Sequence, residues 1–76
     1  MAFRADAVVA KQVTATTTHL VIITRNGKFD IPWEKCSPKL AEAGVLERTR
    51  AELSPSGYGI NWPLLDEDLA VAPLIL

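Results

Sequence analysis

The sequence predicts an α+β domain: a small antiparallel sheet, built from N-terminal hairpin strands and a later short strand, with one or two short helices. Residues 7–18 are rich in valine and threonine, which is typical of strands. Asn26-Gly27 joins two segments of apolar residues, the strongest short signal for a hairpin. Ser37-Pro38 then begins a helical region, so strands and helices fall in separate blocks along the chain.

The first half of the chain contains the predicted hairpin strands. Residues 7–18 are expected to be extended, and His19–Thr24 is the clearest strand, with apolar side chains on both faces. Such a strand is either central in its sheet or covers a partner subunit with one face. Both residues of Asn26-Gly27 accept a positive φ, and after them apolar residues alternate as far as Trp33. Because Pro32 cannot donate a ladder hydrogen bond, this return strand lies at an edge or ends there.

The helical region follows directly. Ser37 is the expected N-cap and Pro38 the first residue of a short helix that ends or bends at Gly44. A second helical candidate spans Val45–Leu53, with charged residues such as Arg48 on its exposed face.

The last quarter of the chain predicts a strand, a turn and an apolar tail. Tyr58–Trp62 is expected to be a short strand that Pro63 ends, and Leu64–Asp68 a turn. Pro73–Leu76 is expected to form a final helical turn. Its apolar side chains must pack on the domain's own core or on another chain.

Length and composition exclude several classes of protein. With 76 residues there is room for one core, so residues 1–76 are expected to be a single domain with frayed residues 1–6. One cysteine and one histidine exclude an internal disulfide and a closed zinc site, so no metal or cofactor is expected. No apolar run approaches the roughly 20 residues that span a bilayer, which predicts a cytoplasmic protein with no membrane association.

Charge and apolar content indicate the kind of partner. A net charge of −1 with scattered basic residues makes nucleic-acid binding an unfavoured reading. A chain of this length buries only roughly 60% of its unfolded surface, and such domains often need a disulfide, a metal or a partner subunit. Because 49% of the residues are hydrophobic and neither a disulfide nor a closed zinc site is expected, the composition favours self-association.

The segment Gly57-Tyr58-Gly59-Ile60-Asn61-Trp62-Pro63, followed by Leu65-Asp66-Glu67-Asp68-Leu69, resembles the domain of unknown function family 2442, a group of small bacterial proteins. Pro38-Lys39-Leu40 and Glu52-Leu53 extend the resemblance, which covers residues 13–76. It implies a small α+β fold with no established enzymatic activity or cofactor. Some members are fused to a helix-turn-helix, and others resemble accessory proteins encoded beside another small protein. Asn61 stands where the family usually has histidine.

The acidic cluster Asp66, Glu67 and Asp68 has three readings. It caps exposed backbone N–H groups in a turn, presents an acidic patch to a basic partner, or binds a divalent cation through its oxygens. Capping is the reading that such short acidic stretches favour.

The aromatic and glycine residues are read as follows. Trp62, before Pro63, is predicted to fill the core, whereas Tyr58 is either a core residue or an interface anchor. Trp33, next to a proline on a predicted edge, is the better interface candidate. Gly57 and Gly59 are expected at a bulge or a positive φ, since no helix follows them to form a phosphate loop.

No catalytic residue emerges, because Cys36 and His19 have no partners in a recognisable arrangement. The sequence therefore predicts a non-enzymatic protein-interaction module that self-associates or pairs with another small protein. The alternative is an antitoxin-like or transcriptional accessory protein that contacts nucleic acid through a basic face from residues such as Arg25, Lys28 and Lys39. The interface candidates are Trp33, Tyr58, Asp66, Glu67, Asp68, Leu74 and Leu76. The structural candidates are Asn26, Gly27, Gly57, Gly59, Trp62 and Pro63.

Overall fold

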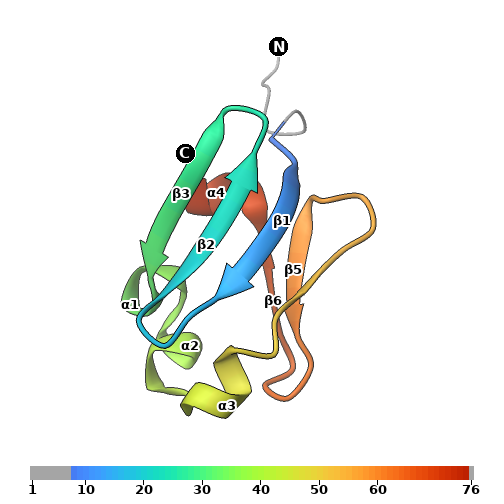
Figure 1. The fold of residues 1–76 in the computed structure, drawn as a ribbon. Coiled ribbons are helices and arrows are strands. Elements are labelled where there is room, and N and C mark those ends of the chain that lie inside the picture. The colour runs from blue at the N-terminus through green and yellow to red at the C-terminus, as the bar shows by residue number, and fades with distance from the viewer. Residues whose placement is uncertain (1–7, 76) are drawn as a thin grey trace.

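The computed structural model describes residues 8–75 and contains two three-stranded antiparallel sheets and four short helices (Figure 1). The predicted α+β class is confirmed. The later strand does not extend the first sheet but belongs to the second. The predicted fraying of residues 1–6 and the interface candidate Leu76 lie outside the described residues. Within residues 8–75, no helix has the length and apolar content needed to cross a membrane.

The first sheet has the order β1-β2-β3, with β1 at Ala10–Ala15, β2 at His19–Thr24 and β3 at Gly27–Pro32. β2 is the central strand of this sheet, which is one of the two alternatives that its apolar residues predicted. Leu20, Ile22 and Thr24 are buried on one face, whereas the side chains on the other face are half-buried. Thr24 pairs with Gly27 across a two-residue turn. Only one residue of the predicted turn pair has a positive φ, because Gly27 takes +134° while Asn26 does not.

The chain leaves the first sheet at Pro32, and this corrects the placement of Trp33. The strand β3 ends at Pro32, and Trp33 begins the helix α1, Trp33–Cys36. Its side chain turns into the core and is only 2% exposed, so Trp33 is a core residue and not an exposed anchor on the edge strand.

The helix α2, Pro38–Glu42, begins as predicted, since the N–H of Leu40 donates to Ser37 Oγ at 3.1 Å. The helix α3, Val45–Arg48, is shorter than the predicted second helix. Thr49 Oγ1 donates to the carbonyl of Val45 at its end, a local bond that competes with continued helix.

The second sheet has the order β4-β5-β6, with β4 at Glu52–Leu53, β5 at Gly59–Trp62 and β6 at Glu67–Ala70. β4 takes the end of the predicted second helix, and β6 begins where the turn was expected to continue. The turn itself contains Pro63 and is closed by the N–H of Leu65, which donates to the carbonyl of Trp62 at 3.0 Å. The helix α4, Val71–Ile75, accommodates Pro73 in its first turn.

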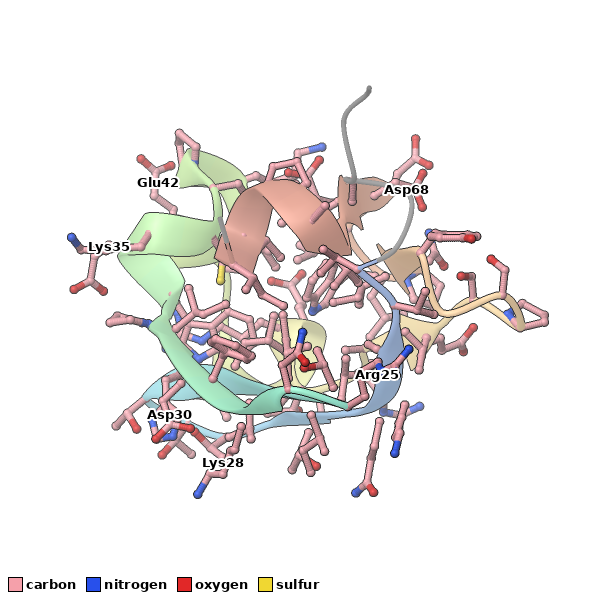
Figure 2. All side chains as sticks on the ribbon, turned by 90° about the horizontal axis from the view of Figure 1, so that it is seen from above. Arg25, Lys28, Asp30, Lys35, Glu42 and Asp68 are labelled. Carbon is pink, nitrogen blue, oxygen red and sulfur yellow. The ribbon has the colours of Figure 1, made fainter. Side chains whose placement is uncertain are left out.

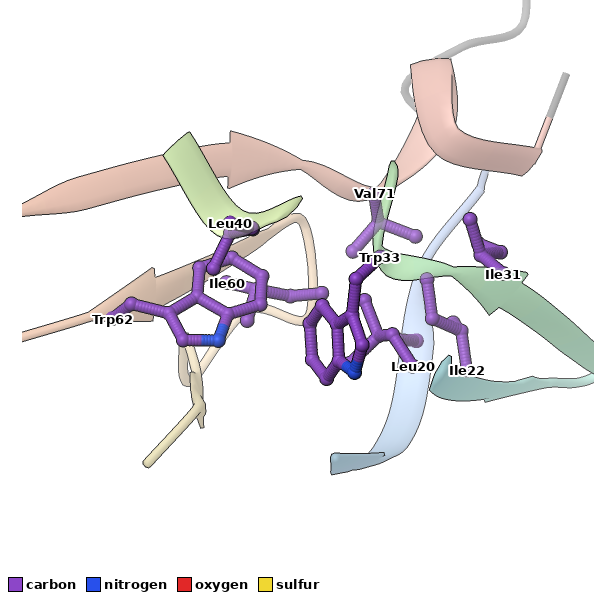
Figure 3. Packing of buried hydrophobic residues seen from close by; sticks show 9 residues of the cluster. Leu20, Ile22, Ile31, Trp33, Leu40, Ile60, Trp62 and Val71 are labelled. Atoms are coloured by element: carbon purple, nitrogen blue, oxygen red, sulfur yellow. The ribbon is translucent and has the colours of Figure 1, made fainter. Parts of the chain in front are cut away.

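The core lies between the two sheets and is centred on two tryptophans (Figure 3). Trp33 and Trp62 meet edge to face, with ring centroids 6.3 Å apart and an interplanar angle of 79°. Each buried indole N–H has a backbone partner, the carbonyl of Thr16 for Trp33 and that of Arg48 for Trp62. The surrounding side chains come from both sheets and two helices: Leu20, Ile22, Ile31, Leu40, Ile60 and Val71.

Gly57 brings the sheets together at one end. Its carbonyl accepts a hydrogen bond from the N–H of Ala10 at 2.8 Å, and its φ is +83°. A Cβ at this position would collide with Val9 Cγ1 and with the carbonyl oxygen of Ala10. Gly59, by contrast, lies in β5 without a positive φ, so the predicted positive φ is found at Gly57 and not at Gly59.

Candidate functional site

The outer edge of β3 carries peptide groups without a partner strand. Thr24 and Gly27 flank the two-residue turn, so they form the hydrogen-bonded pair from which the ladder alternates. This alternation turns the N–H and C=O groups of Lys28 and Asp30 away from β2. Within residues 8–75, neither residue makes a backbone hydrogen bond beyond its own sheet. Free groups of this kind are what a further strand needs in order to pair.

The opposite edge of the same sheet is occupied. β1 lies against β4, and the hydrogen bond from the N–H of Ala10 to the carbonyl of Gly57 connects it to the second sheet. β3 is therefore the edge at which the first sheet is open (Figure 1).

An open groove of about 490 Å³ runs between β3 and α4. Three charged residues, Lys28, Asp30 and Lys35, are among those that line it. Figure 2 shows the side chains of Lys28 and Asp30 on the side of the sheet away from α4. The apolar lining consists of Phe29, Ile31, Pro32, Pro73, Leu74 and Ile75.

The helix α4 is held over the sheet by its first residues. The N–H of Val71 donates to the carbonyl of Tyr58 at 2.8 Å, and the side chains of Val71 and Ala72 are buried. In the described part of the apolar tail, Leu74 and Ile75 are half-buried, pack against the domain's own core and line the groove. Of the predicted interface candidates within residues 8–75, Leu74 is the one that lines this groove.

Tyr58 and the three acidic candidates lie in the second sheet or next to its strands. Tyr58 is 48% exposed just before β5. Asp66 and Asp68 are exposed, Glu67 is half-buried, and Asp66 adopts a φ of +52° that aspartate tolerates better than most residues. Asp68 Oδ1 accepts a hydrogen bond from the Asn61 amide at 2.7 Å, across β5 and β6. Among the described residues, the side-chain hydrogen bond of this cluster is therefore to another side chain, whereas the sequence favoured capping of backbone N–H groups.

Arg48 is half-buried, whereas the helical pattern of Val45–Leu53 predicted it on an exposed face. Its guanidinium lies over the ring of Trp33, 5.5 Å from the centroid. Its terminal N–H groups donate at 3.1–3.4 Å to the backbone carbonyls of Leu40, Ala41, Ala43 and Thr17. Arg48 thus satisfies the end of α2 and ties it to the β1–β2 turn. Thr17 and Arg48 are 31 positions apart, so no local pattern signals this contact.

The side chains of Cys36 and His19, the chain's one cysteine and one histidine, make hydrogen bonds to neighbouring residues. Burial, and to a lesser extent the Glu34 carboxylate, raise the pKa of the Cys36 thiol to about 11, and the thiol donates to the carbonyl of Pro32. At neutral pH this cysteine is almost entirely protonated and is a poor nucleophile. His19 Nδ1 is hydrogen-bonded to the hydroxyl of Thr18 at 2.8 Å. Among the described residues, no three His, Cys, Asp or Glu side chains gather as a metal site requires.

The basic residues named for a nucleic-acid face are separated. Arg25 and Lys28 lie at the β2–β3 hairpin, whereas Lys39 is on α2 at the other end of the sheet (Figure 1). Lys39 also donates to the carbonyl of Leu65 at 3.1 Å. These three residues do not form one contiguous surface.

The protein is a small α+β domain. Its two three-stranded sheets pack around a tryptophan pair, and the first sheet has an open edge strand. The chain belongs to the family described as protein of unknown function (DUF2442), whose model matches residues 10–75. This confirms the resemblance seen in the segment that begins at Gly57.

The fold is shared with a solved structure. The chain is similar to a protein of unknown function from Rhodospirillum rubrum ATCC 11170, known from a crystal structure at 2.75 Å resolution. The two are 24% identical with a TM-score of 0.77, and the match covers 90% of this chain and 84% of that chain. No curated protein matches the sequence.

Proposed function

We propose that this protein is a non-enzymatic, cytoplasmic protein-interaction module that binds through the open edge of β3 and the adjoining groove. Its partner is a second copy of the chain or another small protein. The observation that carries the proposal is the pair of outward peptide groups at Lys28 and Asp30 beside an apolar groove. Proteins that add a strand to a sheet edge gain main-chain hydrogen bonds, and neighbouring pockets select the side chains.

The composition of the edge supports a short and selective contact. Lysine and proline on an edge strand discourage uncontrolled pairing, and β3 has Lys28 and ends at Pro32. The stretch between Gly27 and Ile31 remains able to pair. A partner strand is therefore limited to a few residues, and the groove lining at Phe29 and Leu74 supplies the rest of the contact.

Light scattering after size exclusion, across a concentration series, tests the proposal. The monomer has a mass of 8.3 kDa, and we expect a larger species whose share rises with concentration. The same experiment is repeated with the product of the neighbouring gene. A monomer at every concentration that also forms no complex with that product would overturn the proposal.

The nucleic-acid alternative has less support. Its named basic residues are separated in the fold, and the net charge is −1. It predicts binding to a mixed-sequence duplex that weakens steeply as salt rises. Titration of a labelled duplex at two salt concentrations distinguishes the alternatives.

A further inference from the structure

We propose that the occupant of this edge is a second copy of the chain, joined by an antiparallel β3–β3 pair in which Phe29 faces Phe29 of the second copy. In this arrangement Lys28 of each copy lies opposite Asp30 of the other. The inference rests on the proposed function and specifies its partner and register.

The register follows from which residues present outward groups. Along β3 these are Lys28, Asp30 and Pro32, and Pro32 has no N–H to donate. In a two-fold pair of β3 strands, a residue whose N–H and C=O groups face outward must lie opposite another such residue of the second copy. The symmetry axis therefore passes through one of the strand residues 28 to 31.

Most of these registers are unfavourable. An axis at Lys28 sets the two Lys28 side chains against each other. An axis at Asp30 places the two Asp30 side chains opposite each other. It also pairs Lys28 with Pro32, which has no backbone N–H to donate. An axis at Ile31 pairs Asp30 with Pro32, again without a donor. Like charges directly opposite destabilise a strand pair, and a missing N–H removes a bond.

The axis at Phe29 avoids both penalties. Each Lys28 meets an Asp30 of the other copy, and each of these pairs exchanges both backbone N–H···O bonds. The opposite charges lie on the outer face, where both side chains are exposed. Pro32 falls beyond the paired residues, so its missing N–H costs nothing. The edge is therefore complementary to itself in charge and in hydrogen bonding.

Phe29 gives this register an apolar centre. It points to the same face as Ile31, lines the groove and is half-buried in the single chain. In the pair, the two Phe29 residues form the non-hydrogen-bonded position, where side chains approach most closely. Aromatic pairs at such positions stabilise antiparallel strands. Each ring then covers part of the groove that Leu74 and Ile75 line.

The edge strand of the second sheet lacks this complementarity. The β6 edge carries Glu67 and Asp68 and follows Asp66, with no basic residue among Glu67–Ala70. Two copies paired along β6 therefore bring acid against acid or acid against alanine. β3 is the better self-pairing edge of the two.

Charge reversal provides the test. Lys28→Asp and Asp30→Lys each place like charges opposite one another in a homodimer. In a one-to-one mixture of the two variants, every aspartate again faces a lysine. We expect each variant alone to dimerise on the order of tenfold or more weakly than wild type, and the mixture to recover wild-type affinity as a heterodimer. Sedimentation equilibrium measures the affinities, and circular dichroism verifies that each variant is folded.

Matched controls are the same reversals on exposed strand residues elsewhere, Lys11→Asp on β1 and Glu52→Lys on β4. They carry the same net charges as the test pair, and we expect both to dimerise like wild type. In the wild-type dimer, the amides of Lys28 and Asp30 should exchange hydrogen more slowly as concentration rises.

The outcomes separate the two proposals. A wild-type dimer that neither β3 reversal weakens, or a mixture no tighter than its components, overturns the β3 pair and leaves self-association through another surface. A wild-type monomer at all concentrations overturns the β3 pair as well, and the proposed function then depends on the complex with another small protein.

Discussion

Replacing Gly57 by alanine is expected to destabilise this domain strongly, whereas the same change at Gly59 is expected to have little effect. The two glycines are separated by one residue. At Gly57 a methyl group would collide with Val9 and with the carbonyl of Ala10, and the backbone has a φ of +83°. At Gly59 the nearest atom is the carbonyl oxygen of Leu69 at 3.6 Å, an ordinary van der Waals contact.

The magnitude follows from two contributions. A residue with a Cβ in the left-handed region loses about 1–2 kcal/mol. Forcing a methyl group into a closely packed site typically costs about 1–3 kcal/mol more. The expected loss for Gly57→Ala is therefore about 2–5 kcal/mol, out of about 4–11 kcal/mol for a chain of this length. For Gly59→Ala we expect a change within about 0.5 kcal/mol, because the backbone already suits alanine.

Urea unfolding followed by tryptophan fluorescence measures both variants, since Trp33 and Trp62 are buried where the sheets meet. The difference in unfolding free energy between the two variants is the decisive quantity. Equal stability losses at Gly57 and Gly59, or a loss below about 0.5 kcal/mol at Gly57, would refute the close approach of Gly57 to β1.

Two further predictions concern Arg48 and Cys36. Arg48→Met keeps an apolar stem but leaves carbonyls at the end of α2 without their donor. We therefore expect the free energy of unfolding in urea to fall by about 1–3 kcal/mol, with only part of the loss recovered in Arg48→Lys. A methionine variant as stable as wild type would contradict this role. The pKa of Cys36 is raised to about 11 in the folded state from 9.0, so its stabilising contribution is complete below pH 9 and is lost as pH rises through 11. Thiol labelling at pH 8 should accordingly be much slower in the native protein than in urea, and equal rates would contradict the burial.

Local signals predicted the parts of the fold that depend on neighbouring residues. The central strand, the hairpin and the Ser37 cap each follow from a few adjacent positions. The missed elements depend on distant ones. β4 has two residues and exists because it pairs with β5, so the helical pattern of its sequence was overridden. Trp33 was predicted on the edge strand but lies in the core. Pro32 indicates that the strand ends, but it does not indicate the direction in which the chain then turns.

Of the candidate site at β3, only the edge position of the strand was predictable from the sequence. Pro32 indicated that β3 lies at an edge, and the structure places it there. The groove depends on α4 lying across β3, a contact between segments about 40 positions apart that no local pattern encodes. The self-complementary order of Lys28 and Asp30 becomes visible only once the ladder fixes which peptide groups face outward.

The shared tryptophan pair has a consequence for how this chain acquires its structure. Trp33 belongs to the half of the chain that forms the first sheet, and Trp62 to the half that forms the second. Each half supplies one wall of the core, so neither has an interior of its own. A chain cut in the segment between α3 and β4 is expected to give two fragments that are unstructured apart and fold when mixed. Folding of this domain is in that sense a binding reaction between two peptides that happen to be covalently joined.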